Sequence, residues 1–430
     1  MFPSITAAVL AIGTAVLPLA GSVGTAEAQS AVPAAATTPG WPVTNYVHYV
    51  GGKAGAANPK LSPVYLGWVN QQGGSADLAP EATLGAQFAV KYVNQYLDGV
   101  AGHPLKLVEC FIPDTVSAAA ACGQKFANNP KIQQIVAGPV TIGNQAFEQA
   151  LAPTKKLLNL FAGSTTDSGY KTAVWLYGSS TSLEGPLATF LAKDLKAKSV
   201  AIINENIPGS APIDKAISDG LTLEHVKSTV VTFDPSQTDL TVPLEAAHAS
   251  SVDAIEFGAS GPICANFDKA LKELNINKPV LANVTCIGPQ IAKADGGSLP
   301  RWYYAVGSTL YDDPTDPAAK ALHKVFAEIG VPASLRDDPW MSTTYSQILT
   351  SVKFMNRVGP DNTSAAKVVK LAENFHGPML WGPPQLVCGE FKAAPQVCLD
   401  EDQFFRPNAS GVMVRAQSWV AKPAGEPIDG

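Results

Sequence analysis

Small polar residues follow several apolar, strand-like segments, and their types suit the binding of an anion. Hydroxyl and backbone N–H groups at the start of a helix favour a carboxylate, because the helix dipole leaves partial positive charge there. One such loop alone is more typical of a plain helix cap, but several in one chain favour a ligand-binding cleft. The candidate residues are Asn70, Gln71, Thr141, Gly163, Ser164, Thr165 and Ser260.

No catalytic signature accompanies these loops. The sequence has no GxSxG, no GxxxxGK[ST] phosphate loop, no GxGxxG that opens a helix and no HExxH. It also has no CxxC, and its six histidines are scattered, which argues against a metal site. We therefore expect no catalytic residue, no metal ligand and no cofactor, and a secreted α/β enzyme is kept only as an alternative.

The cysteines indicate an exported protein. Six cysteines allow 15 pairings, and we expect the sequential one because each adjacent pair closes a short loop. A bridge across such a loop contributes roughly 3 kcal/mol to stability in the chain-entropy model. Disulfides persist in oxidising compartments outside the cytoplasm. The expected bridges are Cys110–Cys122, Cys264–Cys286 and Cys388–Cys398.

The N-terminal segment has the pattern of a secretory signal. An apolar run over Val9–Ala20 is too short to span a bilayer and is followed by Ala26-Glu27-Ala28, a small-x-small cleavage pattern. The usual basic start is missing, because no Lys or Arg precedes Lys53. We expect a signal peptide over residues 1–28 and, over residues 29–60, an Ala/Pro-rich linker or an arm that becomes ordered on contact with the folded domain.

Length, charge and periodicity define the scaffold that must position these loops. The 430 residues suffice for two domains, and a net charge of −6 argues against nucleic acid as a partner. Leu84, Phe88, Tyr92 and Tyr96 lie four apart on one face of an expected helix over 80–97. Such helices alternate with more than ten short apolar strands, which predicts parallel α/β sheets in two doubly wound lobes.

The chain resembles the bacterial leucine/isoleucine/valine-binding proteins, the solute-binding components of branched-chain amino-acid ABC transporters. The resemblance covers about Val64 to Val420, and the order and spacing of short segments carry it. These segments are Val64–Val69, Gly85–Val90, Cys110 to Cys122 with Asp114, Gly163-Ser164-Thr165, Tyr177-Gly178, Val200–Ile203 and Thr343-Thr344-Tyr345.

The resemblance implies the type I periplasmic-binding-protein fold, two Rossmann-like α/β lobes joined by three crossovers. We expect lobe 1 to comprise residues 61–177 and 308–385, and lobe 2 residues 178–307 and 386–430. The implied protein is a secreted monomer, periplasmic or associated with the cell surface, that captures a small solute in the interlobe cleft. It then contacts an ABC transporter permease at the membrane. A ligand sensor of the same fold is the alternative.

The resemblance also implies individual ligand contacts. The family's clamp for a ligand carboxylate falls on Thr141, Gly163 and Thr165, with Ser164 between them. The position that often carries an aromatic residue falls near Gly209, and the acidic partner of a ligand ammonium falls near Val284.

Val284 is uncharged, which favours a carboxylate ligand without an amine. The alternative is that Glu205 or Glu256 pairs with the ammonium of an amino-acid ligand instead. Of these two, Glu256 is expected to face outward or to pair structurally. Aromatic residues that could line the ligand's apolar tail are Trp68, Tyr177 and Phe257.

Overall fold

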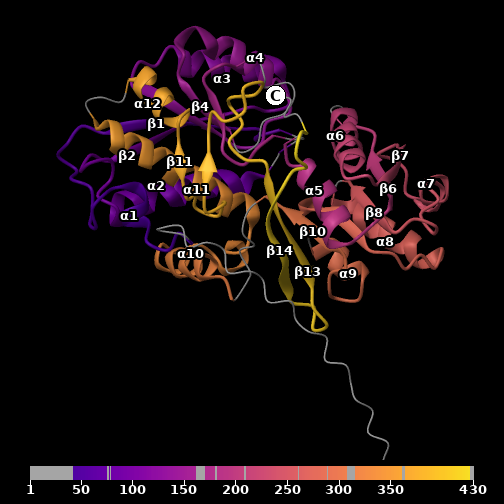
Figure 1. Cartoon of the computed structure of the whole chain (residues 1–430). Coiled ribbons are helices and arrows are strands. Elements are labelled where there is room, and N and C mark those ends of the chain that lie inside the picture. Colours follow the sequence, from indigo (N-terminus) through magenta and orange to yellow (C-terminus); the bar gives the residue numbers. More distant parts are fainter. Residues whose placement is uncertain are drawn as a thin grey trace, which may run out of the picture. The chain divides into compact units, whose positions relative to one another are not determined.

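A computed structural model describes most of the chain and shows two separate β-sheets with helices packed on them (Figure 1). The expected signal peptide lies outside the described residues. No described helix combines the length and apolar character needed to cross a bilayer. The described residues are 42–74, 77, 79–160, 170–179, 182–207, 210–259, 261–287, 289–307, 315–360 and 364–426.

The first sheet has five parallel strands in the order β2-β1-β3-β4-β5. Helices cover both faces of this sheet. Successive residues of a strand point to opposite faces, so each strand packs against helices on both sides. Leu66 and Trp68 pack with α2, α10 and α11, whereas Val69 and Ile135 pack with α3 and α4. The strands are β1 (Val64–Asn70), β2 (Leu105–Phe111), β3 (Ile132–Ala137), β4 (Leu157–Leu160) and β5 (Ala173–Trp175).

The second sheet has seven strands in the order β14-β13-β10-β9-β8-β6-β7. The five strands β6 to β10 are parallel to one another. Strand β13 pairs antiparallel with β10, and β14 pairs antiparallel with β13 at the edge of the sheet. Helices α7, α8 and α9 pack on one face, and α5 and α6 on the other. The strands are β6 (Ser199–Glu205), β7 (Lys227–Phe233), β8 (Ala254–Gly258), β9 (Val280–Asn283), β10 (Tyr303–Val306), β13 (Glu401–Pro407) and β14 (Met413–Ala421).

Two doubly wound α/β sheets confirm the fold class predicted from the sequence. The sequence did not predict β13 or α9, and a short pair, β11 (His376–Gly377) and β12 (Leu386–Val387), was also missed. The helices are α1 (Tyr46–Val50), α2 (Pro80–Tyr96), α3 (Val116–Ala127), α4 (Asn144–Leu151), α5 (Gly185–Thr189), α6 (Ser210–Leu223), α7 (Thr241–Ala246), α8 (Gly261–Glu273), α9 (Pro289–Ala294), α10 (Pro317–Glu328), α11 (Pro339–Val358) and α12 (Ala365–Ala372).

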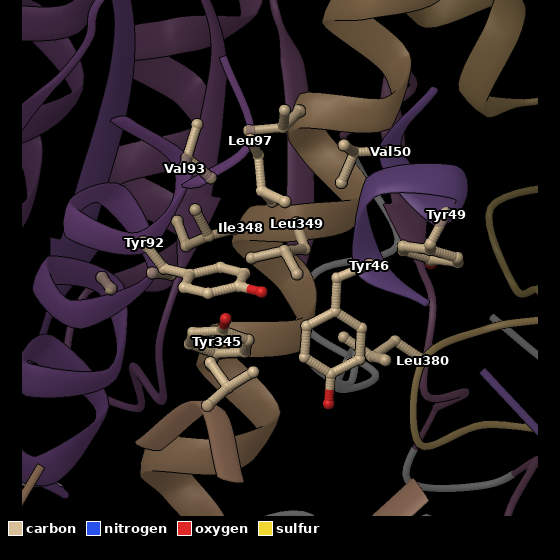
Figure 2. Close-up of a cluster of buried hydrophobic side chains, with 14 of the residues drawn as sticks. Tyr46, Tyr49, Val50, Tyr92, Val93, Leu97, Tyr345, Ile348, Leu349 and Leu380 are labelled. Atoms are coloured by element: carbon tan, nitrogen blue, oxygen red, sulfur yellow. The ribbon is translucent and has the colours of Figure 1, made fainter. Parts of the chain in front are cut away.

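The described part of the segment before β1 is an ordered arm and not a free linker. Within residues 42–60, α1 docks on the first sheet's helices, and Tyr46 and Val50 are buried among side chains of α2 and α11 (Figure 2). The Tyr49 hydroxyl lies 2.8 Å from the Thr350 hydroxyl on α11. Burial of two tyrosines and a valine on this short helix offsets the conformational entropy that is lost when a segment rich in Ala, Pro and Gly becomes ordered.

The segment after residue 385 differs from the expected lobe boundary. Leu386, Cys388 and Leu399 are buried in the same cluster as Val174 of β5 and Val368 of α12. Residues 386–399 therefore pack with the helices and strands of the first sheet, and the chain enters the second sheet at β13. The short β11–β12 pair explains the difference, because it ties this segment to residues just before it.

All three expected disulfides are present. Cys110–Cys122 links the end of β2 to α3, and Cys264–Cys286 links α8 to the turn after β9. Cys388–Cys398 closes the loop between β12 and β13. Sequential pairing is confirmed, and the chain has no free cysteine.

Candidate functional site

The loop between β3 and α4 presents three hydrogen-bond donors to one point. The Thr141 amide, the Thr141 hydroxyl and the Ile142 amide donate to the Gln71 side-chain oxygen at 3.0, 3.1 and 2.9 Å. Gln71 is buried, with 2% of its surface exposed, whereas Thr141 is exposed. The sequence analysis singled out both residues, and the structure brings them together across 70 positions of the chain.

Backbone hydrogen bonds hold the loop after β1 between its two neighbours. The Gln71 amide donates to the Pro139 carbonyl at 3.3 Å, and the Gln72 amide donates to the Ile112 carbonyl at 3.2 Å. Gly138 donates to the Val69 carbonyl at 2.9 Å. Because these loops lie at the carboxyl ends of adjacent parallel strands, they form one edge of the first sheet, where ligands of open α/β sheets bind.

Buried polar side chains support this edge from below. The Trp68 indole donates to Thr83 at 3.0 Å, and the Thr83 hydroxyl donates to the Gln72 side-chain oxygen at 2.7 Å. Asn70 is fully buried, and its amide donates to the Ala79 carbonyl at 3.3 Å. Asn70 is therefore a supporting residue beneath the loops rather than part of their exposed surface.

Gly138 makes this close packing possible. A Cβ atom at this position would lie 2.6 Å from the Asn70 side-chain oxygen and 3.0 Å from the Trp68 ring. Such separations are too short for ordinary contacts, so a larger residue would displace either the polar support or the indole.

Several expected ligand contacts lie outside the described residues. They are Gly163, Ser164, Thr165, Gly209 and Ser260. The geometry of the expected carboxylate clamp therefore rests on Thr141 and its neighbour Ile142 alone. Of the three ligand contacts expected from the second lobe, Gly209, Val284 and Ser260, only Val284 is described.

Val284 lies where a ligand can reach it, whereas the acidic residues that might replace it do not. Val284 begins a short 3-10 turn after β9 and is 40% exposed. Glu205 and Glu256 are 3% and 2% exposed. Of the two alternatives expected for Glu256, facing outward is wrong and a structural partner is present. Glu256 lies on the face of β8 that α5 and α6 cover, and its side chain is hydrogen-bonded with Asn204.

Glu256 belongs to a buried polar layer that sequence reasoning missed. Burial first, and the charges of Glu184 and Asp214 second, raise the pKa of Glu256 well above its usual range. The same causes, burial followed by Asp214 and Glu426, raise the pKa of Glu184 to about 8. Asn204 satisfies part of this layer, since its amide donates to Asp214 at 2.7 Å and its oxygen accepts from the Gly258 amide at 2.5 Å.

The aromatic candidates for an apolar wall are core residues. Trp68, Tyr177 and Phe257 are each no more than 1% exposed and pack in three different hydrophobic clusters. The Tyr177 hydroxyl donates to Ser346 at 2.8 Å. Among the residues that the structure describes, no three His, Cys, Asp or Glu side chains form a metal-binding group.

The two doubly wound sheets and the loop edge define a type I periplasmic binding protein. The family model described as periplasmic binding protein matches residues 63–396, and the chain therefore belongs to that family. Its fold is shared with solved leucine- and isoleucine-binding proteins of the same type. Membership implies a location outside the cytoplasm. Comparison with curated protein sequences finds no match.

Solved structures of low sequence identity share this fold. A leucine-binding protein from Thermotoga maritima has a TM-score of 0.64 and 16% identity, over 84% of this chain and 99% of its own. A fatty acid ABC transporter substrate-binding protein from Thermomonospora curvata has a TM-score of 0.66 and 16% identity, over 87% and 96%. An ABC transporter solute-binding protein from R. palustris in complex with 4-hydroxybenzoate has a TM-score of 0.66 and 15% identity, over 85% and 98%.

Proposed function

We propose that this protein is the extracytoplasmic solute-binding component of an ABC importer and that its solute is a small carboxylic acid without an amine. The solute binds in the cleft expected between the two lobes and is delivered to a permease. The observation that carries the proposal is the convergence of the Thr141 and Ile142 donors at the sheet edge.

The donors of this loop suit a carboxylate and divide between two roles. Gln71 holds the two backbone N–H groups and so fixes the loop, which makes it a positioning residue. The Thr141 hydroxyl is exposed and rotates freely, so it turns from Gln71 to a carboxylate oxygen of the solute. A charge-assisted hydrogen bond to the solute is stronger than the neutral bond it replaces. Gly163 and Thr165 complete the proposed clamp.

The chemistry of the neighbours supports a carboxylate. Solved structures of similar proteins contain leucine, isoleucine or 4-hydroxybenzoate, and one similar protein is a fatty acid ABC transporter substrate-binding protein. A carboxylate is the group that these four ligand types share. An ammonium group is present in two of them only.

The second lobe argues against an ammonium group in this protein's solute. A buried ammonium costs several kcal/mol unless an ionised carboxylate or equivalent partner receives it. Val284 offers none, and burial, together with the charges of Glu184 and Asp214, raises the pKa of Glu256 and so disfavours its ionised form. Glu205 and Glu256 are both buried below the surface that a solute reaches.

The test is calorimetric titration of the purified chain with leucine and with a panel of aliphatic and aromatic monocarboxylates. We expect at least one acid to bind more tightly than leucine, isoleucine or valine. Micromolar leucine binding with no response to any acid would overturn the assignment of the solute class while leaving the transport role intact.

Variants of Thr141 test the site itself. Thr141→Ala is expected to weaken binding of the best acid by about tenfold, because it removes a hydrogen bond to a charged group. Thr141→Ser keeps the hydroxyl and serves as the matched control, with an affinity close to that of the unmodified chain. Equal affinities for all three proteins would place the carboxylate elsewhere.

A further inference from the structure

A pocket far from the proposed solute loop is lined by four basic side chains. It lies where α1 packs against the C-terminal half of α11 and has a volume of about 450 Å³. Its basic residues are His48, Lys353, Arg357 and His376, and no Asp or Glu is among its lining residues. In a chain with a net charge of −6, this local excess of positive charge stands out.

Lys353 is the central group of this pocket. It is only 9% exposed, and its ammonium lies 4.1 Å from the centre of the Tyr49 ring and 5.0 Å from that of Phe375. Within the described part of the chain, the ammonium has no hydrogen-bond acceptor and no carboxylate partner. Contacts with aromatic faces offset only part of the cost of removing a charge from water.

Arg357 increases this unbalanced charge. It follows Lys353 by four residues on α11, a spacing at which like charges repel one another. Burial, with the charge of Arg357 as a second cause, lowers the pKa of Lys353 to about 8. At neutral pH the ammonium is therefore still mostly protonated and faces a pocket without a counter-ion from the described residues.

The walls of the pocket are firmly held, so the cationic groups are preorganised. Asn45 caps α1 by accepting from the His48 amide at 3.0 Å, and Tyr49 is tied to Thr350. Asn356 donates to the Val50 carbonyl at 2.9 Å and so fixes the end of α1 to α11. Figure 2 shows the buried side of this contact, with Tyr46 and Val50 pointing toward α11.

One wall of the pocket lies outside the matched family region, and the rest of the lining lies within it. The family match begins at residue 63, whereas the wall from Pro42 to Gly51 precedes it. The wall thus covers a part of lobe 1 that the proposed solute site does not use.

We propose that this pocket is a second binding site, specific for a dianionic phosphate group. Lys353 supplies a charge at the base, and Arg357 supplies the planar donors that match phosphate oxygens. His48 and His376 add donors at the exposed rim. The volume exceeds what a bare phosphate needs, so the pocket also accepts the organic part of a phosphomonoester against Tyr49. Free phosphate compounds and lipid headgroups both carry this group.

The test is calorimetric titration of the full chain with inorganic phosphate at constant ionic strength, with sodium chloride as the reference. We expect saturable binding to one site. Lys353→Gln and Arg357→Gln are each expected to weaken it by about tenfold or more, because each removes a charge-assisted hydrogen bond. Lys370→Gln, at an exposed lysine of α12 outside the pocket, is the matched control and leaves the affinity unchanged.

Two further measurements keep the result decisive. Arg357 is exposed, so Arg357→Gln is expected to fold even if Lys353→Gln does not. If the two sites are separate, both variants bind the best carboxylic acid as tightly as the unmodified chain does. Co-sedimentation with phosphatidylcholine vesicles that contain phosphatidic acid identifies the source. Vesicle binding that Arg357→Gln abolishes supports a lipid headgroup, and phosphate binding without vesicle binding supports a soluble phosphomonoester. Absence of phosphate binding, or full binding by both variants, overturns the proposal.

Discussion

Replacing Gln71 with Met removes one acceptor at the centre of the proposed solute loop while nearly conserving side-chain volume. The Gln71 oxygen accepts from two backbone amides, at 3.0 and 2.9 Å, and from the Thr141 hydroxyl. The exposed Thr141 hydroxyl can donate to water instead, so the loss of its hydrogen bond to Gln71 costs little. Each amide bond contributes about 1 kcal/mol net, and an amide left without an acceptor adds a desolvation cost. We expect Gln71→Met to lower the free energy of unfolding by about 2–3 kcal/mol.

The assay is urea denaturation of the oxidised protein, followed by tryptophan fluorescence. Gln145→Met is the matched control, because Gln145 is an exposed glutamine in the first turn of α4. Surface substitutions of this kind usually change stability by less than about 0.5 kcal/mol. If Gln71→Met behaves like the control, then water already satisfies the two amides and Gln71 does not hold the loop.

The same variant separates positioning from direct contact. If Gln71 acts by fixing the loop, Gln71→Met weakens solute binding, and a second change, Thr141→Ala, adds less than it does in the unmodified chain. Coupling of this kind is expected for residues that share one hydrogen-bond network. Independent, additive effects would mean that Gln71 touches the solute separately from Thr141.

Three further outcomes are expected. Gly138→Ala lowers the melting temperature and weakens solute binding, because its Cβ would lie 2.6 Å from the Asn70 oxygen; an unchanged melting curve would contradict this packing. Glu256→Gln stabilises the protein more at pH 8 than at pH 4, since burial raises the pKa of Glu256 and disfavours its ionised form in the folded chain, whereas in the unfolded chain it ionises above about pH 4.3. Urea denaturation at both values checks the sign, and a larger gain at pH 4 would refute it. Thiol titration of the denatured, unreduced chain detects no free thiol, and two or more per chain would contradict the three bridges.

The buried acidic layer of the second sheet has a consequence for pH response. Glu184 and Glu256 have pKa values above their usual range, mainly because of burial. A carboxyl group with a raised pKa does not lower the free energy of unfolding at acidic pH, where it is protonated in both states. The free energy of unfolding falls as the pH rises from the unfolded-state pKa toward the folded-state pKa. The layer lies beneath the carboxyl ends of β6 and β8, next to the loops expected to contact the solute.

Local patterns in the sequence determined much of the fold. The helix expected over 80–97 spans Pro80–Tyr96, because apolar residues four apart indicate a helix without reference to any distant segment. The disulfides follow the same logic, since each bridge closes a short loop. Thr141 and Gln71 were identified as candidates because both follow apolar strands, and parallel strands bring their carboxyl ends to one edge.

Only the tertiary structure decided which groups these residues meet. The sequence around Tyr46 and Tyr49 resembles a linker, and α1 forms because α11, about 300 residues away, offers a surface that buries them. The sequence left open whether Glu256 faces outward or pairs structurally, and helices on both faces of the second sheet bury the first four residues of its strand, Glu256 among them. Chain composition reports local propensity, whereas burial and pKa depend on contacts between distant segments. For this reason the raised pKa of Glu256 and the charged pocket at Lys353 are visible only in the folded chain.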